Sequence, residues 1–167
     1  MTTARGAARV TVREARIEDV VPLSDALEPE VSRRQIAMRL QEHFEGHRVL
    51  WVPDLDGQPV ATVSHGGPRH KLPGSLRLFA LDVGKDYRRR GIGAALVRAV
   101  EEEARRQGLS TVNLEVAQAN TDASRLYKRL GYRSSGAPIV ERWERAGENG
   151  ALEPVREVIW VMVKRLD

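Results

Sequence analysis

The chain has 167 residues, 41% of them apolar and 30% charged, a composition typical of one globular domain with its own hydrophobic core. It contains no cysteine, which excludes disulfides, zinc–thiolate sites and cysteine nucleophiles and fits a reducing compartment. The net charge is +4. Without a recognised binding motif, this mild excess argues against a nucleic-acid-binding protein and leaves that class as the weakest alternative.

The hydropathy pattern predicts a cytoplasmic protein with no membrane segment. No apolar run reaches the roughly 20 residues that span a bilayer, and the first residues lack the apolar core of a secretory signal. We expect a single domain over residues 1–167, with residues 1–8 as a flexible tail.

The first elements predicted are a strand, a short helix and a hairpin. The alternation that begins at Val10 is that of a strand, and residues 20–27 have a short helical pattern. Two β-rich runs in residues 47–67 flank Asp56-Gly57, a dipeptide typical of hairpin turns.

Residues 31–46, between the short helix and the hairpin, predict a longer helix. Ser32 and Gln35 have the spacing of a capping box, and Gly46 is a typical stop. The periodicity places Phe44 on the buried face of this helix.

The second half of the chain completes a mixed sheet. Residues 75–83 predict an apolar central strand, and residues 91–108 predict the longest helix, with an i,i+4 pair between Glu101 and Arg105 on its surface. A strand, a short helix and two final strands follow, at residues 110–117, 120–131, 132–145 and 155–166. This order of elements predicts an α/β fold in which helices pack on a mixed sheet.

The segment DYRRRGIGAAL, residues 86–96, has the features of an anion-binding loop. Arg88, Arg89 and Arg90 come directly before Gly91 and Gly93, where a loop turns into the long helix. The first turn of a helix has unpaired N–H groups and the positive end of the helix dipole, and glycine lets an anion approach them closely.

Two common nucleotide motifs do not fit this segment. A Walker loop needs Lys followed by Ser or Thr where the chain has Ala94-Ala95, and a dinucleotide-binding fingerprint needs a glycine at Leu96. Spacing alone therefore leaves open another kind of phosphate site or a plain helix N-terminus with an exposed basic rim.

Residues 76–133 carry a family resemblance. The segment YRRRGIG resembles the Arg/Gln-x-x-Gly-x-Gly/Ala signature of the GNAT superfamily, the acyl-CoA-dependent N-acyltransferases. LDVGKDY resembles the strand and turn before that signature, and LEVAQANTDASRLYKRLGYR resembles the strand, the Asn-x-x-Ala-x-x-x-Tyr helix and the Gly-Tyr/Phe step after it.

The resemblance implies a fold and a ligand. The fold would be GNAT-like, with central strands that splay apart and helices on both faces of the sheet. The ligand would be acetyl-CoA, with its diphosphate at the amides of the loop and its pantetheine arm along the end of the preceding strand. The cofactor-binding residues implied are Leu81, Asp82, Val83, Arg88, Arg89, Arg90, Gly91, Ile92, Gly93, Ala94, Asn120, Ser124 and Tyr127.

The resemblance also implies the chemistry. Tyr127 occupies the family's general-acid position and would protonate the departing thiolate, although its place on an apolar helix face also fits a core tyrosine. A main-chain N–H near Val83 would stabilise the oxyanion. The general base stays open among Asp82, Glu115, His65 and ordered water.

Other side chains carry weaker hypotheses. His43 and His47 are i,i+4, but Gly46 interrupts the helix between them, and no carboxylate spacing completes a metal site. We therefore expect no metal. Trp143 and Trp160 fit core packing, an acceptor pocket or a dimer contact.

The sequence thus predicts an N-acetyltransferase that passes an acetyl group from acetyl-CoA to a primary amine by direct attack in a ternary complex. The amine could belong to a small molecule or a peptide. A homodimer fits the family, and neither membrane nor nucleic acid is expected as a partner. The alternatives are a non-catalytic acyl-CoA-binding module of the same fold and a basic nucleic-acid-associated protein.

Overall fold

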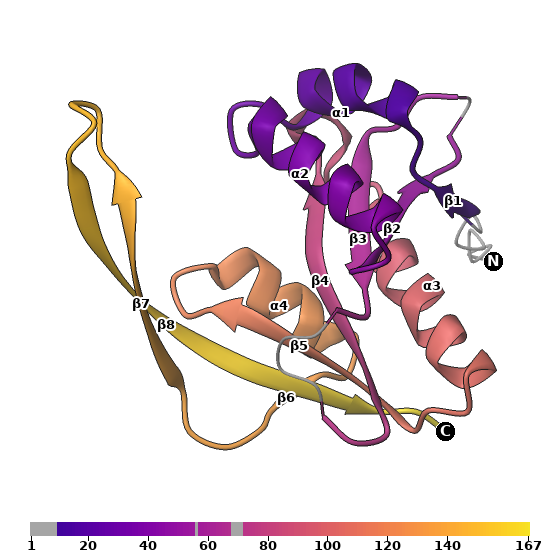
Figure 1. Ribbon diagram of the computed structural model, residues 1–167. Coiled ribbons are helices and arrows are strands. Elements are labelled where there is room, and N and C mark those ends of the chain that lie inside the picture. Colours follow the sequence, from indigo (N-terminus) through magenta and orange to yellow (C-terminus); the bar gives the residue numbers. More distant parts are fainter. Residues whose placement is uncertain (1–9, 56, 68–71) are drawn as a thin grey trace, which may run out of the picture.

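A computed structural model describes residues 10–55, 57–67 and 72–167 (Figure 1). The predicted tail at residues 1–8, Asp56 of the predicted turn, and His70 lie outside the described residues.

The described residues form a sheet of eight strands in the order β1-β2-β3-β4-β5-β8-β6, with β7 also paired to β8. All pairings are antiparallel except the parallel pairing of β4 with β5, so the sheet is mixed as predicted. The strands are β1 (Val12–Glu14), β2 (Val49–Pro53), β3 (Ala61–His65), β4 (Ser75–Val83), β5 (Thr111–Ala117), β6 (Arg133–Ser134), β7 (Ile139–Ala146) and β8 (Leu152–Arg165).

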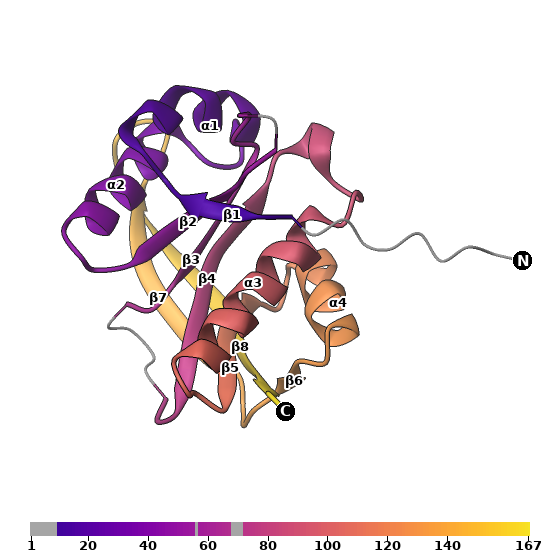
Figure 2. The same cartoon turned by 90° about the vertical axis from the view of Figure 1, so that its right-hand side faces the viewer.

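Helices cover both faces of the sheet, which confirms the predicted architecture. α1 (Val20–Leu27) and α2 (Arg33–Phe44) share one core with β2, whereas α3 (Ile92–Arg106) and α4 (Thr121–Arg129) share a larger core with β3, β4, β5 and β8. Figure 2 shows α3 and α4 side by side on the second face. Two short 3-10 turns, η1 (Ile17–Asp19) and η2 (Lys85–Tyr87), precede α1 and α3.

The helix α2 begins as the sequence predicts but differs at its end. Ser32 accepts a hydrogen bond from the Gln35 main chain, and the Gln35 side chain accepts one from the Ser32 N–H, which completes the capping box. Phe44, predicted on the buried face, is 59% exposed, because the helix stops there and the last turn extends beyond the core.

The last two strands are longer and more exposed than predicted. The predicted strand at residues 132–145 is split into β6 and β7, and β8 starts three residues before the predicted residue 155. Eight residue pairs join β7 to the first half of β8, from Ile139 opposite Ile159 to Ala146 opposite Leu152. We call this hairpin, Ile139–Ala146 with Leu152–Ile159, the ribbon; it projects from the body of the protein (Figure 1).

A buried charge ties α3 to the sheet. Glu101, predicted to pair with Arg105 on the helix surface, is 3% exposed and accepts a 2.7 Å bond from Lys164 of β8 and a 3.3 Å bond from the Tyr132 hydroxyl. The prediction was wrong because Glu101 lies on the apolar side of the helix beside Val97 and Val100, where only a partner from the sheet reaches it.

We predict that Lys164→Met lowers the free energy of unfolding by about 3 kcal/mol, because it leaves the Glu101 carboxylate buried without its cation. A second variant, Lys164→Met with Glu101→Leu, should recover most of this loss because neither charge remains. Urea denaturation measures both. Equal stability of the single variant and the wild type would contradict the role of Lys164 as the charge partner of Glu101.

Candidate functional site

The site begins where β4 and β5 stop pairing. Only Ser75–Arg77 of β4 pair with Thr111–Asn113 of β5, so the remaining residues of the two strands diverge. The predicted splay of the central strands is therefore present. It leaves the end of β4, with Leu81, Asp82 and Val83, facing a gap rather than a neighbouring strand.

A bulge in β4 sets the direction of these three residues. Thr62 of β3 pairs with Asp82 while Ser64 pairs with Phe79, so β4 carries one extra residue in this interval. Ala80 takes up the distortion with a φ of 52°, which is unfavourable for a residue with a Cβ. As a result Leu81 and Val83 pack toward the α3 core, whereas Asp82 contacts α2 on the other face.

The loop from β4 to α3 presents main-chain amides. Arg89 and Gly91 have φ values of 61° and 82°, so two left-handed residues flank Arg90 just before the helix. The N-cap residue of α3 is Gly91, and no side chain caps this helix. A Cβ at Gly91 would meet no atom within 4 Å, so the space beside the amides is open.

The arginines of the loop have different environments. Arg88 donates from Nε to the Val83 carbonyl at 3.0 Å, and its guanidinium lies 3.6 Å from Glu30. Arg90 stacks over the ring of Tyr87 at 5.4 Å. The Arg88 side chain therefore lies against the end of β4.

A tight contact anchors the same loop to α1. An added Cβ at Gly84 would lie 2.7 Å from the Ala26 carbonyl oxygen and 3.2 Å from the Val60 carbonyl oxygen. Only glycine fits at this point, and the sequence analysis assigned it no role. The signal that could have found it is its position directly after β4 in VGKDY.

The helix α4 packs one predicted residue into the core and places another at a separate pocket. Tyr127 is 7% exposed and packs in the core shared with α3. The Asn120 side chain caps α4 by accepting a bond from the Ala123 N–H. Ser124 lines a separate pocket of about 370 Å³ whose other lining residues include Trp160 and Met162 of β8, with no residue of β4 or α3.

The surroundings of Tyr127 keep its hydroxyl protonated. Burial raises the pKa of the phenol well above its ordinary value of 10, and the negative charge of Asp82 raises it further. Leu81 and Val83 at the end of β4 pack against the same core, so the phenol lies on the side of the sheet that these two residues face. A phenol in this state can donate a proton and does not lose it at neutral pH.

Both candidate carboxylates are bound by arginines. Asp82 lies 2.8 Å from Arg39 of α2, and Glu115 accepts bonds of 3.1 Å to each oxygen from Arg77 Nε. Arg77 also lies over the ring of Phe79 at 4.2 Å. These groups form a largely buried polar layer on the α2 side of the sheet, opposite the core that holds Tyr127.

A hydrogen-bonded network supports the bulge from that side. Thr62, fully buried, donates from Oγ1 to the Ala80 carbonyl at 3.2 Å and accepts a 3.0 Å bond from Arg39. The same guanidinium binds Asp82, two residues after the bulge. Sequence reasoning missed Arg39 and Thr62, because no local pattern links residue 39 to residue 80.

A family model, described as Acetyltransferase (GNAT) family, matches residues 15–132, which include the loop, the gap and Tyr127. The chain belongs to the GNAT family. This confirms the resemblance inferred from the sequence.

Curated relatives match over part of their length. The chain is 36% identical over 91 residues to a probable N-acetyltransferase camello of Xenopus tropicalis, and 40% identical over 101 residues to the human N-acetyltransferase 8B. These matches cover 54% and 58% of this chain but only 41% and 43% of the relatives. The chain thus spans less than half the length of these relatives.

Solved structures agree in fold. A ribosomal-protein-S18-alanine N-acetyltransferase of Escherichia coli superposes with a TM-score of 0.64 at 21% identity, covering 93% of this chain and 92% of that one. A Bacillus subtilis acetyltransferase in complex with CoA has a TM-score of 0.65 at 15% identity, covering 95% and 98%. At these identities the likeness shows the fold alone.

His65 lies away from the gap of this GNAT chain. It is 4% exposed, its ring centroid is 4.4 Å from that of Trp51, and it interacts electrostatically with Glu103 and Arg106 at the C-terminal end of α3. That end is about 22 Å from the N-terminus of the helix at 1.5 Å per residue. In β3, His65 pairs with Leu78, whereas Ala61, four residues away, pairs with Val83, so His65 lies away from the end of β4.

His43 and His47 have local partners. His43 Nδ1 accepts a 3.1 Å bond from the Leu50 N–H and joins α2 to β2, and exposed His47 lies 3.5 Å from Glu45. Trp143 is exposed on the ribbon, whereas Trp160 lines the pocket next to α4, so the two side chains do not share a site. In the described part of the chain no three His, Asp or Glu side chains group as metal ligands, and no helix is long and apolar enough to cross a membrane.

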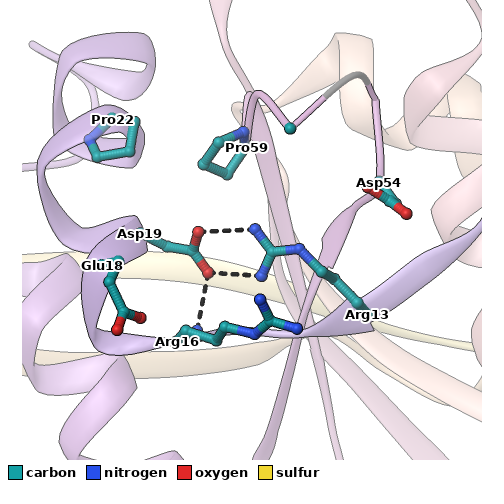
Figure 3. A pocket seen from close by; sticks show the side chains of 8 residues that line it. Arg13, Arg16, Glu18, Asp19, Pro22, Asp54 and Pro59 are labelled. Atoms are coloured by element: carbon teal, nitrogen blue, oxygen red, sulfur yellow. Dashed lines mark hydrogen bonds and ion pairs between the residues drawn. The ribbon is translucent and has the colours of Figure 1, made fainter.

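A pocket of about 540 Å³ lies outside the site, at the junction of β1, α1 and the end of β2 (Figure 3). Its main charges are already paired: Arg13 binds both oxygens of Asp19 at 2.7 and 2.8 Å, and the Arg16 N–H donates to Asp19 as well. Burial acts against ionisation, but these hydrogen bonds lower the pKa of Asp19. The arrangement is a structural brace between β1 and α1.

We predict that His65 makes the protein less stable in acid. Burial lowers the pKa of His65 in the folded state below the ordinary value of 6.5, so the unfolded chain takes up the proton first as the pH falls. The contribution of neutral His65 is full above pH 6.5 and is lost as the pH drops through the folded pKa. As the pH is lowered from 8 to 5, the urea concentration at the midpoint of unfolding should fall less steeply for His65→Leu than for the wild type.

The matched control is His47→Gln, which removes an exposed histidine. It should reproduce the wild-type slope. If His65→Leu also reproduced it, the buried neutral histidine would not be the source of the acid sensitivity.

Proposed function

We propose that this GNAT chain transfers an acetyl group from acetyl-CoA to a primary amine by direct attack in a ternary complex. The observation that carries the proposal is the uncapped N-terminus of α3, which opens beside the gap between β4 and β5. A cytoplasmic location is part of the proposal and rests on the cysteine-free composition.

The residues present fit acetyl-CoA. The amides of Arg88 through Ala94 would hold the diphosphate, because they lie at an uncapped helix N-terminus with open space beside Gly91. The backbone of Leu81, Asp82 and Val83 follows β3 on one edge but has no strand on the β5 edge, where it would bind the pantetheine arm as an added strand would. Acetyl-CoA, when bound, supplies the acetyl group as a thioester.

Two groups of the chain would act on the reacting atoms. A main-chain N–H near Val83 would stabilise the negative charge that develops on the acyl oxygen. Tyr127, held protonated by burial, would give its proton to the sulfur as the carbon–sulfur bond breaks and the amine nitrogen bonds to the acyl carbon.

The amine is proposed to lose its proton to ordered water. Asp82 and Glu115 each already bind an arginine, and His65 lies toward the far end of α3.

The acceptor is proposed to approach from the α2 side of the sheet, where Asp82, Glu115 and their arginines lie. Release of free thiol from acetyl-CoA across a panel of small amines and peptides tests the proposed acetyl transfer. Turnover with any amine supports the enzyme. Binding of CoA without turnover would favour a non-catalytic acyl-CoA-binding module, and DNA retention without CoA binding would favour a nucleic-acid-associated protein.

We predict that Tyr127→Phe lowers kcat by about 100-fold or more, since the departing thiolate loses its proton donor. The affinity for CoA, measured by calorimetry, should stay nearly the same. Tyr132→Phe is the control, because Tyr132 is a neighbouring buried tyrosine whose hydroxyl contacts Glu101 instead of the gap. An unchanged kcat in Tyr127→Phe would remove Tyr127 from the mechanism.

A further inference from the structure

The bulge of β4 has a backbone conformation that its own sequence does not favour. Ala80 has a φ of 52°, in the left-handed region that glycine adopts readily and alanine rarely adopts. Strain of this kind persists only where surrounding contacts enforce it. If Ala80 relaxed, the path of the three residues that follow it, Leu81 to Val83 at the end of β4, would change. A contact that enforces this φ therefore acts on the backbone proposed to bind the cofactor.

Thr62 of β3 bonds directly to the strained residue. Its side chain is fully buried, and its Oγ1 donates to the Ala80 carbonyl at 3.2 Å. That carbonyl and the Leu81 N–H belong to one planar peptide unit, so the bond fixes the orientation of both groups. The hydroxyl of Thr62 thus controls the main chain at the first residue of the proposed binding segment.

Arg39 of α2 adds two contacts to the same place. Its Nη1 donates to Thr62 Oγ1 at 3.0 Å, and its Nη2 lies 2.8 Å from Asp82 Oδ2. Because Oγ1 accepts from Arg39 on one side, its own hydrogen is left to bond to Ala80. The planar guanidinium therefore holds β4 on both sides of Leu81, through a hydroxyl before it and a carboxylate after it.

The packing of α2 fixes the position of Arg39. Ile36 and Leu40, which flank it on the helix, are 0% and 1% exposed in the core shared with β2. The Arg39 side chain is itself only 14% exposed. A movement of the guanidinium would have to displace this packed helix. The conformation of β4 thus depends on a helix that belongs to the other core of the protein.

We propose that Arg39 is a positioning residue that holds the end of β4 in the conformation required for acetyl transfer. The inference rests on the proposed function, in which a main-chain N–H near Val83 stabilises the oxyanion. Arg39 acts on this N–H through Thr62 and Asp82 and touches no reacting atom. Because a hydrogen-bond donor stabilises an oxyanion only at the correct distance and angle, a displaced backbone lowers the rate more than the affinity.

Two single variants and a conservative replacement test this role. In the ligand-free protein, Arg39→Met and Thr62→Val should both shift the NMR signals of the amides at residues 80–83, because Ala80 relaxes. With an amine that supports turnover, both should lower kcat by about 10- to 100-fold and change the affinity for CoA by less than about threefold. Thr62→Ser keeps the hydroxyl and should match the wild type in both measurements.

The double variant shows whether the two side chains act through the same backbone. Arg39→Met combined with Thr62→Val should lower kcat by less than the product of the two single effects, because residues of one network are not additive. A reduction equal to that product would mean that the two side chains act independently and would overturn the inference.

A glycine at residue 80 provides a rescue that only the proposed mechanism predicts. Ala80→Gly removes the Cβ that makes a positive φ unfavourable, so this residue has less tendency to relax when Arg39 is lost. Arg39→Met combined with Ala80→Gly should therefore have a kcat about threefold or more above that of Arg39→Met alone. If Arg39 only stabilised the packing of α2, a change at residue 80 would restore nothing.

Arg48→Met is the matched control. The Arg48 side chain is 13% exposed, against 14% for Arg39, and lies on the same side of the sheet. It also donates to one carboxylate, that of Glu42, and to one hydroxyl of β3, that of Ser64. Ser64 pairs with β4 before the bulge. This variant should leave kcat and the signals of residues 80–83 unchanged.

The outcomes separate the inference from the function on which it rests. Unshifted amides in Arg39→Met, equal shifts in Arg48→Met, or no recovery by Ala80→Gly would overturn the inference. Signals from the rest of the protein show that each variant is folded. Shifted amides in a protein that acetylates no amine would confirm that Arg39 holds β4 and would reject the proposed function.

Discussion

The parallel pairing of β4 and β5 stops after three residue pairs, and the site depends on that stop. Had the strands stayed paired, the backbone N–H and C=O groups of Leu81 to Val83 that face β5 would have bonded to that strand. The bulge at Ala80 changes the register of β4, and the hydrogen bonds of Thr62 and Arg39 hold the backbone in that register. An unpaired stretch of strand in the middle of a sheet is costly unless a ligand or solvent satisfies it.

The two faces of the sheet differ in burial and in charge. On one face, α3 and α4 pack closely enough to bury Tyr127, and this burial keeps the phenol protonated. On the other face, arginines bind every candidate carboxylate that the sequence analysis named near the gap. The proposed proton donor is therefore buried and neutral, whereas the proposed acceptor side is polar and charged.

The order of elements and the loop before α3 could be predicted because their signals are local. The capping box of α2, the glycines at the start of α3 and the alternation of β5 each lie within a few residues. Glu101 and Phe44 were predicted wrongly for the same reason: local periodicity says nothing of Lys164, 63 residues away, or of where the core ends. The Arg39–Thr62–Ala80 network joins three separate elements and leaves no local pattern.

The central claim is that the amides at the start of α3 bind the diphosphate of CoA, and calorimetric titration with CoA tests it most directly. Gly91 and Gly108 lie at opposite ends of α3, both with positive φ and with open space beside them. Alanine at either position imposes a similar strain, so only the change at the anion-binding end should affect binding. The account predicts that Gly91→Ala weakens CoA binding by about tenfold while Gly108→Ala leaves it unchanged. Equal affinities in the two variants, or no binding by the wild type, would contradict it.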